Sequence, residues 1–125
     1  MQEEKLEGKL ESKPSFDAKK VFVDESFADI VPWFLDNRKE DINKLKEMVE
    51  AEDFEQIHKM GHRWKGTCAS YGFQKLSEAG EILENLSLRK SKQEILDLLS
   101  RTGDYIGTVE VVYVAPNESS SETSV

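Results

Sequence analysis

The sequence contains little cysteine and no long hydrophobic run. Its single cysteine, Cys68, excludes an intramolecular disulfide and a metal site built from several cysteines. No apolar stretch approaches the roughly 18 to 20 residues that a membrane-spanning helix needs. The opening residues, "MQEEKLEGKLESK", are too acidic and polar for a secretory signal. We therefore expect a cytoplasmic protein whose core is stabilised by side-chain packing alone.

Positive charge is also scarce. The chain has 17 Lys and Arg residues against 25 Asp and Glu residues, which gives a formal net charge of −8. Such an excess of negative charge disfavours general binding to nucleic acid or to an anionic membrane surface.

With 125 residues, the chain is long enough for one domain and too short for two ordinary ones. We expect a monomeric single-domain protein whose partner is another protein.

Both ends of the chain lack the apolar periodicity of a folded domain. Residues 1–21 are rich in Glu and Lys and include Gly8 and Pro14, which is typical of a flexible segment. Residues 116–125, "PNESSSETSV", are small and polar, as expected of a disordered C-terminal tail. The folded domain is therefore predicted to span residues 22–115.

Between these ends, apolar residues recur at helical spacing in four successive blocks. The first block predicts a helix over about 26–50, with Pro32 in an early turn where its missing N–H is tolerated. The second predicted helix starts after Asp53, which forms a capping-box pattern with Gln56, and it stops at Gly72.

The third and fourth blocks complete the predicted fold. The third helix is expected to end near 85–87, and its small residues Ala79 and Gly80 would let another helix approach closely. The fourth starts at a capping-box pattern of Ser91 with Glu94. Its last stretch, "VEVVYV", is β-branched, but the helical phase persists and no partner strand is apparent, so we predict helix there too. Four helices joined by short loops predict an all-α fold, an antiparallel (up-down) four-helix bundle.

The second helix contains an unusual segment, "GHRWKG", from Gly61 to Gly66. A glycine inside a helix costs about 1 kcal/mol relative to alanine, so two of them in six residues require an explanation. At about 100° per residue, one broad apolar face lies almost opposite His62 and forms the core side. His62 is therefore predicted to be accessible, in an outward arc that also holds Glu55, His58, Lys59, Lys65, Gly66 and Ala69.

This outward arc has the chemistry of a phosphoryl acceptor. A neutral imidazole nitrogen is nucleophilic at physiological pH. Lys65 lies one turn away on the same side, where its ammonium group could meet phosphoryl oxygens. Gly66 leaves one flank of His62 uncrowded. The run from His58 to Lys65 also contains Lys59 and Arg63 and no acidic residue, which suits a partner with an acidic pocket.

The pattern His62-x-x-Lys65-Gly66, followed by small residues and Gly72 in "HRWKGTCASYGF", resembles the histidine-containing phosphotransfer (HPt) domain of two-component phosphorelays. The similarity extends over about residues 25–110. At three positions where the family usually has smaller aliphatic residues, this sequence has larger aromatic ones: Trp64, Tyr71 and Phe73. These departures concern packing and partner choice, because the acceptor and its lysine are both present.

The resemblance implies a phosphocarrier rather than an ATP-using kinase. His62 would accept the phosphoryl group, Lys65 would lie beside it, and Gly66 would give clearance. The partners would be response-regulator receiver domains or a hybrid sensor kinase. No cofactor of the chain itself is implied, since Mg²⁺ would arrive with the receiver. The surrounding outward residues are the predicted partner-binding surface: Glu55, His58, Lys59, Arg63 and Ala69.

Two other interpretations remain at this point. Glu55, His58 and His62 share one face and could form half of a zinc site in a metal-binding bundle, although Lys59 and Lys65 would repel the ion. Alternatively, the basic patch could dock a partner in a helical adaptor without phosphotransfer. Replacement of His62 by alanine distinguishes these classes, because an adaptor would keep its binding and a phosphocarrier would lose transfer.

Overall fold

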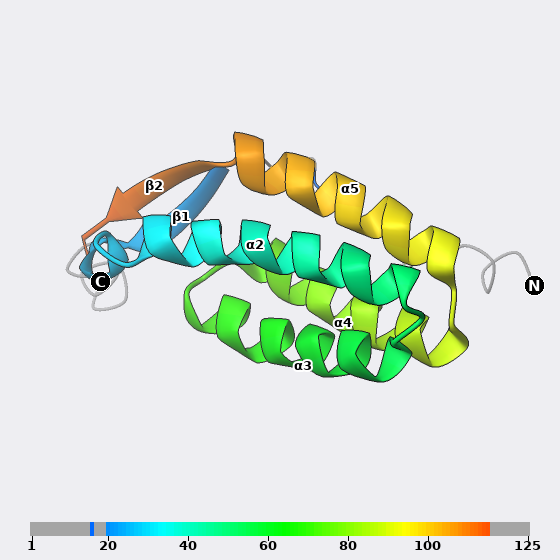
Figure 1. Cartoon of the computed structure of the whole chain (residues 1–125). Coiled ribbons are helices and arrows are strands. Elements are labelled where there is room, and N and C mark those ends of the chain that lie inside the picture. The colour runs from blue at the N-terminus through cyan, green and yellow to red at the C-terminus, as the bar shows by residue number, and fades with distance from the viewer. Residues whose placement is uncertain (1–15, 17–19, 116–125) are drawn as a thin grey trace, which may run out of the picture.

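The computed structural model describes Phe16 and residues 20–115, in which four helices pack lengthwise and a short strand pair lies at one end (Figure 1). Helices α3 and α4 make the most extensive contact of any two elements, and α5 closes the bundle by packing against both α4 and α2. In chain order the elements are β1 (Lys20–Asp24), the 3-10 helix η1 (Glu25–Phe27), α2 (Val31–Glu50), α3 (Phe54–Ser70), α4 (Gln74–Arg89), α5 (Lys92–Thr108) and β2 (Glu110–Val114). The prediction of a bundle of four helices is confirmed in this coarse form, but the chain is not all-α because β1 and β2 form a strand pair.

Local signals at the helix ends explain most of the boundaries. Pro32 lies in the first turn of α2, as predicted. The Asp53 carboxylate accepts a hydrogen bond from the Gln56 backbone N–H at 3.3 Å and so caps α3. Gly72 follows α3 with a φ of +88°, a left-handed conformation that suits glycine. Ser91 precedes α5 but makes no side-chain capping bond, so the predicted second capping box is wrong.

A pair of glycines brings α3 and α4 unusually close together. A Cβ on Gly61 would lie 2.7 Å from the Gly80 carbonyl oxygen, and a Cβ on Gly80 would lie 2.6 Å from the Gly61 carbonyl oxygen. The small-residue patch at Ala79 and Gly80 is therefore where another helix approaches, as predicted. The Ser77 hydroxyl adds a hydrogen bond from α4 to the Lys65 carbonyl oxygen at 2.7 Å.

The opposite side of α3 packs against α2 through a large aromatic side chain. Trp64 is buried, and its Nε1–H donates to Asp41 Oδ2 at 2.9 Å. Arg38 lies 3.1 Å from the same carboxylate and covers the Phe34 ring, with 4.9 Å from Cζ to the ring centroid. Cys68 is also buried. The inward orientation predicted for Trp64 and Cys68 is thus confirmed.

The prediction of helix for the last part of the fourth block is wrong. Helix α5 ends at Thr108, Val109 is extended, and residues 110–114 form β2, which pairs in parallel with β1. The register places Val21 opposite Val111 and Val23 opposite Tyr113. Valine-rich segments favour the extended conformation when a partner strand exists. Here that partner comes from the other end of the chain, with Val23 buried in the core.

The strand pair also changes the domain boundary. Strand β1 begins at Lys20, two residues before the predicted start of the folded domain at 22. The expected flexible segment 1–21 otherwise lies outside the described residues, apart from Phe16, and so does the expected tail 116–125. Among the helices that the structure describes, none is long and apolar enough to cross a membrane.

Candidate functional site

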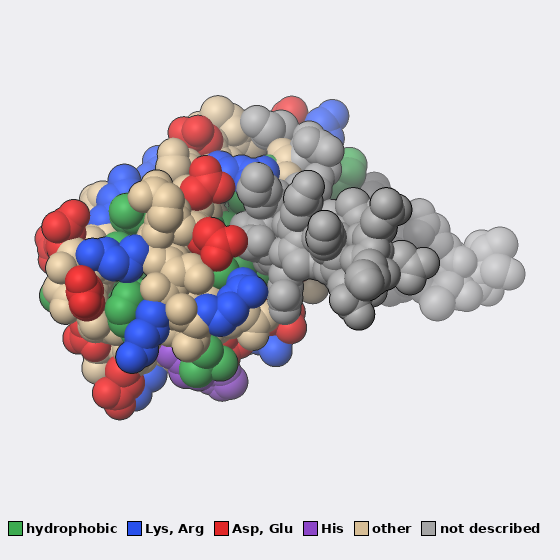
Figure 2. Space-filling view, turned by 90° about the vertical axis from the view of Figure 1, so that its right-hand side faces the viewer, with side chains coloured by type: hydrophobic (Ala, Val, Ile, Leu, Met, Phe, Trp, Pro, Cys, Tyr) green, Lys and Arg blue, Asp and Glu red, His purple; other side chains and the backbone are tan. Residues whose placement is uncertain are grey.

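His62 occupies the middle of α3, on the side that faces away from the core. Its side chain is 76% exposed, as the helical phase predicted. The neighbours Gly61 and Trp64 are buried, so the helix cannot rotate without losing core contacts. Seen along the bundle, the histidine side chains reach the surface beside Lys and Arg side chains (Figure 2). The most reactive group of the segment is therefore held at the surface by a rigid helix.

A carboxylate from α4 fixes the orientation of the His62 ring. His62 Nδ1 lies 2.7 Å from Glu84 Oε2, and the Glu84 side chain is only 14% exposed. An ionised carboxylate only accepts hydrogen bonds, so the ring carries its proton on Nδ1 and donates it to Glu84. The other nitrogen, Nε2, then keeps its lone pair. This pair is the arrangement that a nucleophilic imidazole requires.

Glu84 was not among the residues predicted from the sequence. A single helix gives no indication of which residue faces it from a neighbour. One signal was present, because Glu84 lies four residues after Gly80, on the same side of the helix as the small-residue patch. The close contact of Gly61 with Gly80 sets the rotation and offset of the two helices, and so brings Glu84 to His62.

Lys65 and Gly66 both lie on the exposed side of α3 beside His62. Lys65 is about half exposed, and its Nζ is 3.9 Å from Glu81 Oε2, a long and loose ion pair. Around Gly66, a Cβ would meet nothing within 4 Å apart from its own helix and chain neighbours. Within the described part of the chain, no packing contact therefore requires a glycine at this position. Ala69, one turn further along, is also exposed.

Of the remaining outward residues, Glu55, His58 and Lys59 precede His62 along α3, and Arg63 directly follows it. His58 donates from Nδ1 to the Glu84 carbonyl oxygen at 3.3 Å, with Ser87 Oγ 3.4 Å away. Lys59 pairs with Glu55 at 3.7 Å. A hollow of about 550 Å³ is lined by His58, Lys59, His62 and Arg63. The predicted partner-binding residues other than Ala69 thus lie close together around His62.

The metal-binding interpretation needs at least one ligand more than the histidine pair. Glu55 is engaged with Lys59, and Glu84 is engaged with His62. Among Phe16 and residues 20–115, no group of three His, Cys, Asp or Glu side chains is placed to hold an ion. The described residues therefore give this interpretation no third ligand.

Comparison with known proteins identifies the family. The family model described as Hpt domain matches residues 29–108, which span α2 through the end of α5. No curated protein and no solved structure matches the chain. The matched segment contains His62 with Glu84, and also Lys65 and Gly66. More than half of the chain fits the family model, and the chain therefore belongs to the Hpt domain family, whose members carry phosphoryl groups on a histidine in phosphorelays rather than acting as kinases.

Proposed function

We propose that this chain is a phosphorelay intermediate whose His62 accepts a phosphoryl group from the phospho-aspartate of one receiver domain and passes it to the aspartate of another. The observation that carries this proposal is the exposed His62 ring with its Nδ1–H bound to Glu84 at 2.7 Å. This bond leaves the lone pair of Nε2 available for attack on phosphorus. No other exposed side chain among the described residues combines a free imidazole nitrogen with a fixed ring.

The transfer step needs only groups that this chain and its partner supply. The Nε2 lone pair attacks phosphorus, an N–P bond forms, and the P–O bond to the receiver's aspartate breaks, which releases a free carboxylate. The phosphorylated ring gains positive charge. The Glu84 carboxylate stabilises this charge through the hydrogen bond from Nδ1. In onward transfer the aspartate oxygen of the second receiver attacks the same phosphorus, and the N–P bond breaks.

Lys65 and Gly66 have supporting roles in this proposal. The Lys65 ammonium group is held only loosely by Glu81, at 3.9 Å, so it is free to move toward the phosphoryl oxygens and neutralise their charge. Gly66 leaves the open space through which the receiver brings its aspartate to His62. The receiver supplies the Mg²⁺ that its own acidic residues bind, and this chain needs no cofactor.

The fine arrangement of the bundle and the partner surface follow from the same residues. We propose the up-down, antiparallel order, because connections as short as 51–53, 71–73 and 90–91 force each helix to reverse direction. The receiver contacts the outward face of α3 around His62, through Glu55, His58, Lys59, Arg63 and Ala69. Lys59 and Arg63 attract the acidic pocket that surrounds a receiver's aspartate.

The test follows a labelled phosphoryl group. The purified chain is mixed with receiver domains phosphorylated by labelled acetyl phosphate in the presence of Mg²⁺. Label on the wild-type chain is expected to be labile in acid and stable in alkali, and to be absent from His62→Ala. His58→Gln is the matched variant at the second histidine. It should still carry label at the end point, whatever the rate at which it is labelled. Label retained by His62→Ala would contradict the proposal.

A second pair of variants tests the role of Lys65. Lys65→Ala is expected to slow transfer about tenfold, because it loses the charge that neutralises the phosphoryl oxygens. Its circular dichroism should match the wild type, since the side chain is half exposed. Lys75→Ala, which removes a lysine from the first turn of α4, should transfer at the wild-type rate. If no receiver labels the wild-type chain while His62→Ala still binds them, the chain is an adaptor instead.

A further inference from the structure

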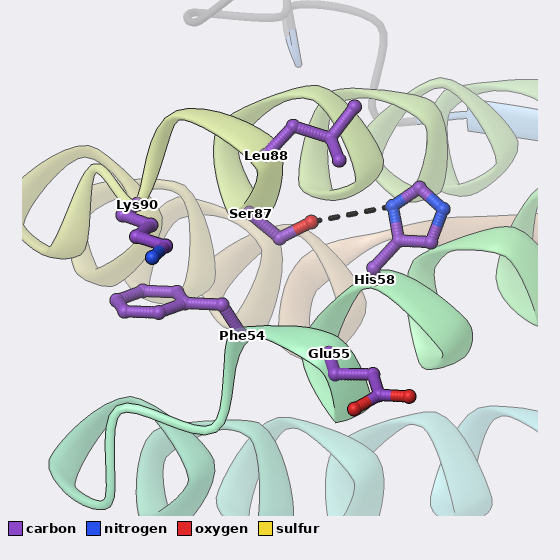
Figure 3. A pocket seen from close by; sticks show the side chains of 6 residues that line it. All are labelled: Phe54, Glu55, His58, Ser87, Leu88 and Lys90. Carbon is purple, nitrogen blue, oxygen red and sulfur yellow. Dashed lines mark hydrogen bonds between the residues drawn. The ribbon is translucent and has the colours of Figure 1, made fainter.

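A second hollow lies beside the candidate site, between the start of α3 and the end of α4 (Figure 3). We call it the end groove. Its volume is about 280 Å³, and it is lined by Phe54, Glu55, His58, Ser87, Leu88 and Lys90. Figure 3 shows the Phe54 ring directed toward Lys90, while Ser87 Oγ is directed toward the His58 ring. The end groove therefore combines an apolar surface with a cation at one end.

The apolar part of the end groove is unusually exposed. The Leu88 side chain is 70% exposed, and Phe54 is only partly buried against the core. Among the described residues, four large hydrophobic residues are exposed, and Leu88 is the most exposed of them: Phe22, Trp33, Leu88 and Tyr113. Leu88 alone among them lies on α3 or α4, the helices that form the candidate site. Covering such a side chain with a partner removes apolar surface from water and favours binding.

The end groove adjoins the hollow at His62, because His58 lines both of them. Phe54 precedes His62 by eight residues, which is about 12 Å along a helix. A standard protein interface buries about 800 Å² on each partner, which corresponds to a disc of about 16 Å radius. An interface of this size centred on His62 is therefore wide enough to include the end groove.

We propose that the end groove is a second anchor for the receiver domain, which places an aliphatic side chain against Phe54 and Leu88 and a carboxylate near Lys90. This inference rests on the proposed function, because that function brings the receiver to His62. The anchor lies outside the reacting atoms. It therefore determines how tightly the receiver binds and does not change the transfer step itself. Glu55, the carboxylate that lines the end groove, is paired with Lys59 at 3.7 Å. The Lys90 ammonium group is therefore the main charge beside the apolar surface, and it matches a partner with a carboxylate beside its aliphatic residue.

The test compares two exposed large hydrophobic residues. Leu88→Ser removes the apolar wall of the end groove, and Trp33→Ser is the matched control, a 60% exposed residue in the first turn of α2 at the other end of the bundle. The probe is the receiver domain that labels the wild-type chain. Leu88→Ser is expected to raise KM for the phosphorylated receiver about tenfold and to change kcat by less than twofold. Trp33→Ser should change neither constant by more than twofold.

A charge variant tests the cationic end of the groove. Lys90 has a φ of 55°, a left-handed conformation that asparagine tolerates, so Lys90→Asn removes the charge without straining the turn. Its KM should rise about threefold at low salt and approach the wild-type value at high salt, because exposed charges are screened. Urea denaturation of each variant establishes that the fold is intact.

A small phosphoryl donor separates this inference from the proposed function. Phosphoramidate needs no docking surface, so Leu88→Ser should be labelled on His62 at the wild-type rate by this donor. A wild-type KM for Leu88→Ser with the receiver would overturn the end groove as an anchor while leaving the relay intact. A wild-type chain that takes label from phosphoramidate but from no receiver would overturn both. Sedimentation showing a wild-type dimer that Leu88→Ser disrupts would assign the groove to a second copy of the chain.

Discussion

The two glycines that flank His62 in α3 face opposite surroundings. Gly61 points into the contact with α4, where a Cβ would lie 2.7 Å from a backbone oxygen and 2.9 Å from Leu83 Cβ. Gly66 points outward, where a Cβ would meet no neighbouring atom within 4 Å. Each glycine costs the helix about 1 kcal/mol relative to alanine. At Gly61 close packing offsets this cost, whereas at Gly66 nothing within the described part of the chain does.

This contrast separates residues that build the site from residues that leave room for a partner. The inward side of α3 holds the helix in position through Gly61, Trp64 and Cys68, all of them buried. The outward side carries His62 and Lys65, with side chains that make few contacts of their own. A glycine retained on the outward side without a packing reason is what a docking site for another protein requires. Variants at both glycines test this interpretation.

The largest expected effect is the loss of stability in Gly61→Ala. The new methyl group would clash with the backbone of α4, so the helices must move apart, and we expect the free energy of unfolding to fall by about 3 kcal/mol. Urea denaturation followed by circular dichroism measures this change. Gly66→Ala is the matched control and should gain up to about 1 kcal/mol from better helix propensity. Equal stability of the two variants would show that the α3–α4 contact is not tight.

The next effect concerns transfer rather than folding. Gly66→Gln places a long side chain beside His62, and we expect the rate of transfer from a phosphorylated receiver to fall by a factor of ten or more, which is at least about 1.4 kcal/mol in activation free energy. Its stability should equal or slightly exceed that of the wild type. Labelling by phosphoramidate should be affected much less, since a small donor needs little clearance. An unchanged rate with the receiver would mean that Gly66 does not serve to give the receiver clearance.

Glu84 connects the buried and the exposed side of α3, because the packing of α4 against α3 places its carboxylate next to the exposed His62 ring. Glu84→Ala leaves Nδ1 without its acceptor, and we expect transfer to slow about tenfold, or about 1.4 kcal/mol. Glu84→Gln should recover part of the rate, since its amide oxygen still accepts from Nδ1–H although the charge is lost. Nitrogen chemical shifts of the His62 ring report the tautomer directly. A ring that keeps its proton on Nδ1 in Glu84→Ala would show that Glu84 does not set the tautomer.

Helical periodicity alone predicted much of this arrangement. The phase of α3 placed His62 outward and Trp64 inward, because the burial of one face of a helix fixes the exposure of the other. Glu84 could not be predicted in the same way. Its contact with His62 depends on the rotation and offset of α4 relative to α3, which arise from the Gly61–Gly80 contact and not from either helix alone.

The strand pair was missed for a different physical reason. The segments Lys20–Asp24 and Glu110–Val114 lie near opposite ends of the chain, and a parallel pair leaves no turn signal between its strands. Read locally, the valines of the second segment continue the helical phase of α5. Their preference for the extended conformation decides the outcome once β1 offers backbone hydrogen bonds. The error does not affect the site, because α3 and α4 lie outside the strand pair.

The smallest expected effect concerns Cys68, a second nucleophile in α3 that faces inward. Burial raises the pKa of its thiol from 9.0 to about 12, against the opposing influence of Arg38. Because the folded-state pKa is the higher one, the neutral thiol stabilises the fold below pH 9, and this stability is lost as the pH rises through 9 toward 12. At pH 10 we expect a loss of about 1 kcal/mol relative to pH 8 from this group.

Urea denaturation of the wild type and of Cys68→Ala at both pH values measures this loss. The variant has no thiol to ionise, so its free energy of unfolding should fall less between pH 8 and pH 10, whatever its baseline stability. Iodoacetamide should modify the folded wild-type thiol slowly at pH 8, whereas diethyl pyrocarbonate should modify His62 quickly. Rapid alkylation of Cys68 in the folded protein would mean that the inward side of α3 opens easily. The contrast between a fixed inner side and a reactive outer side of this helix would then fail.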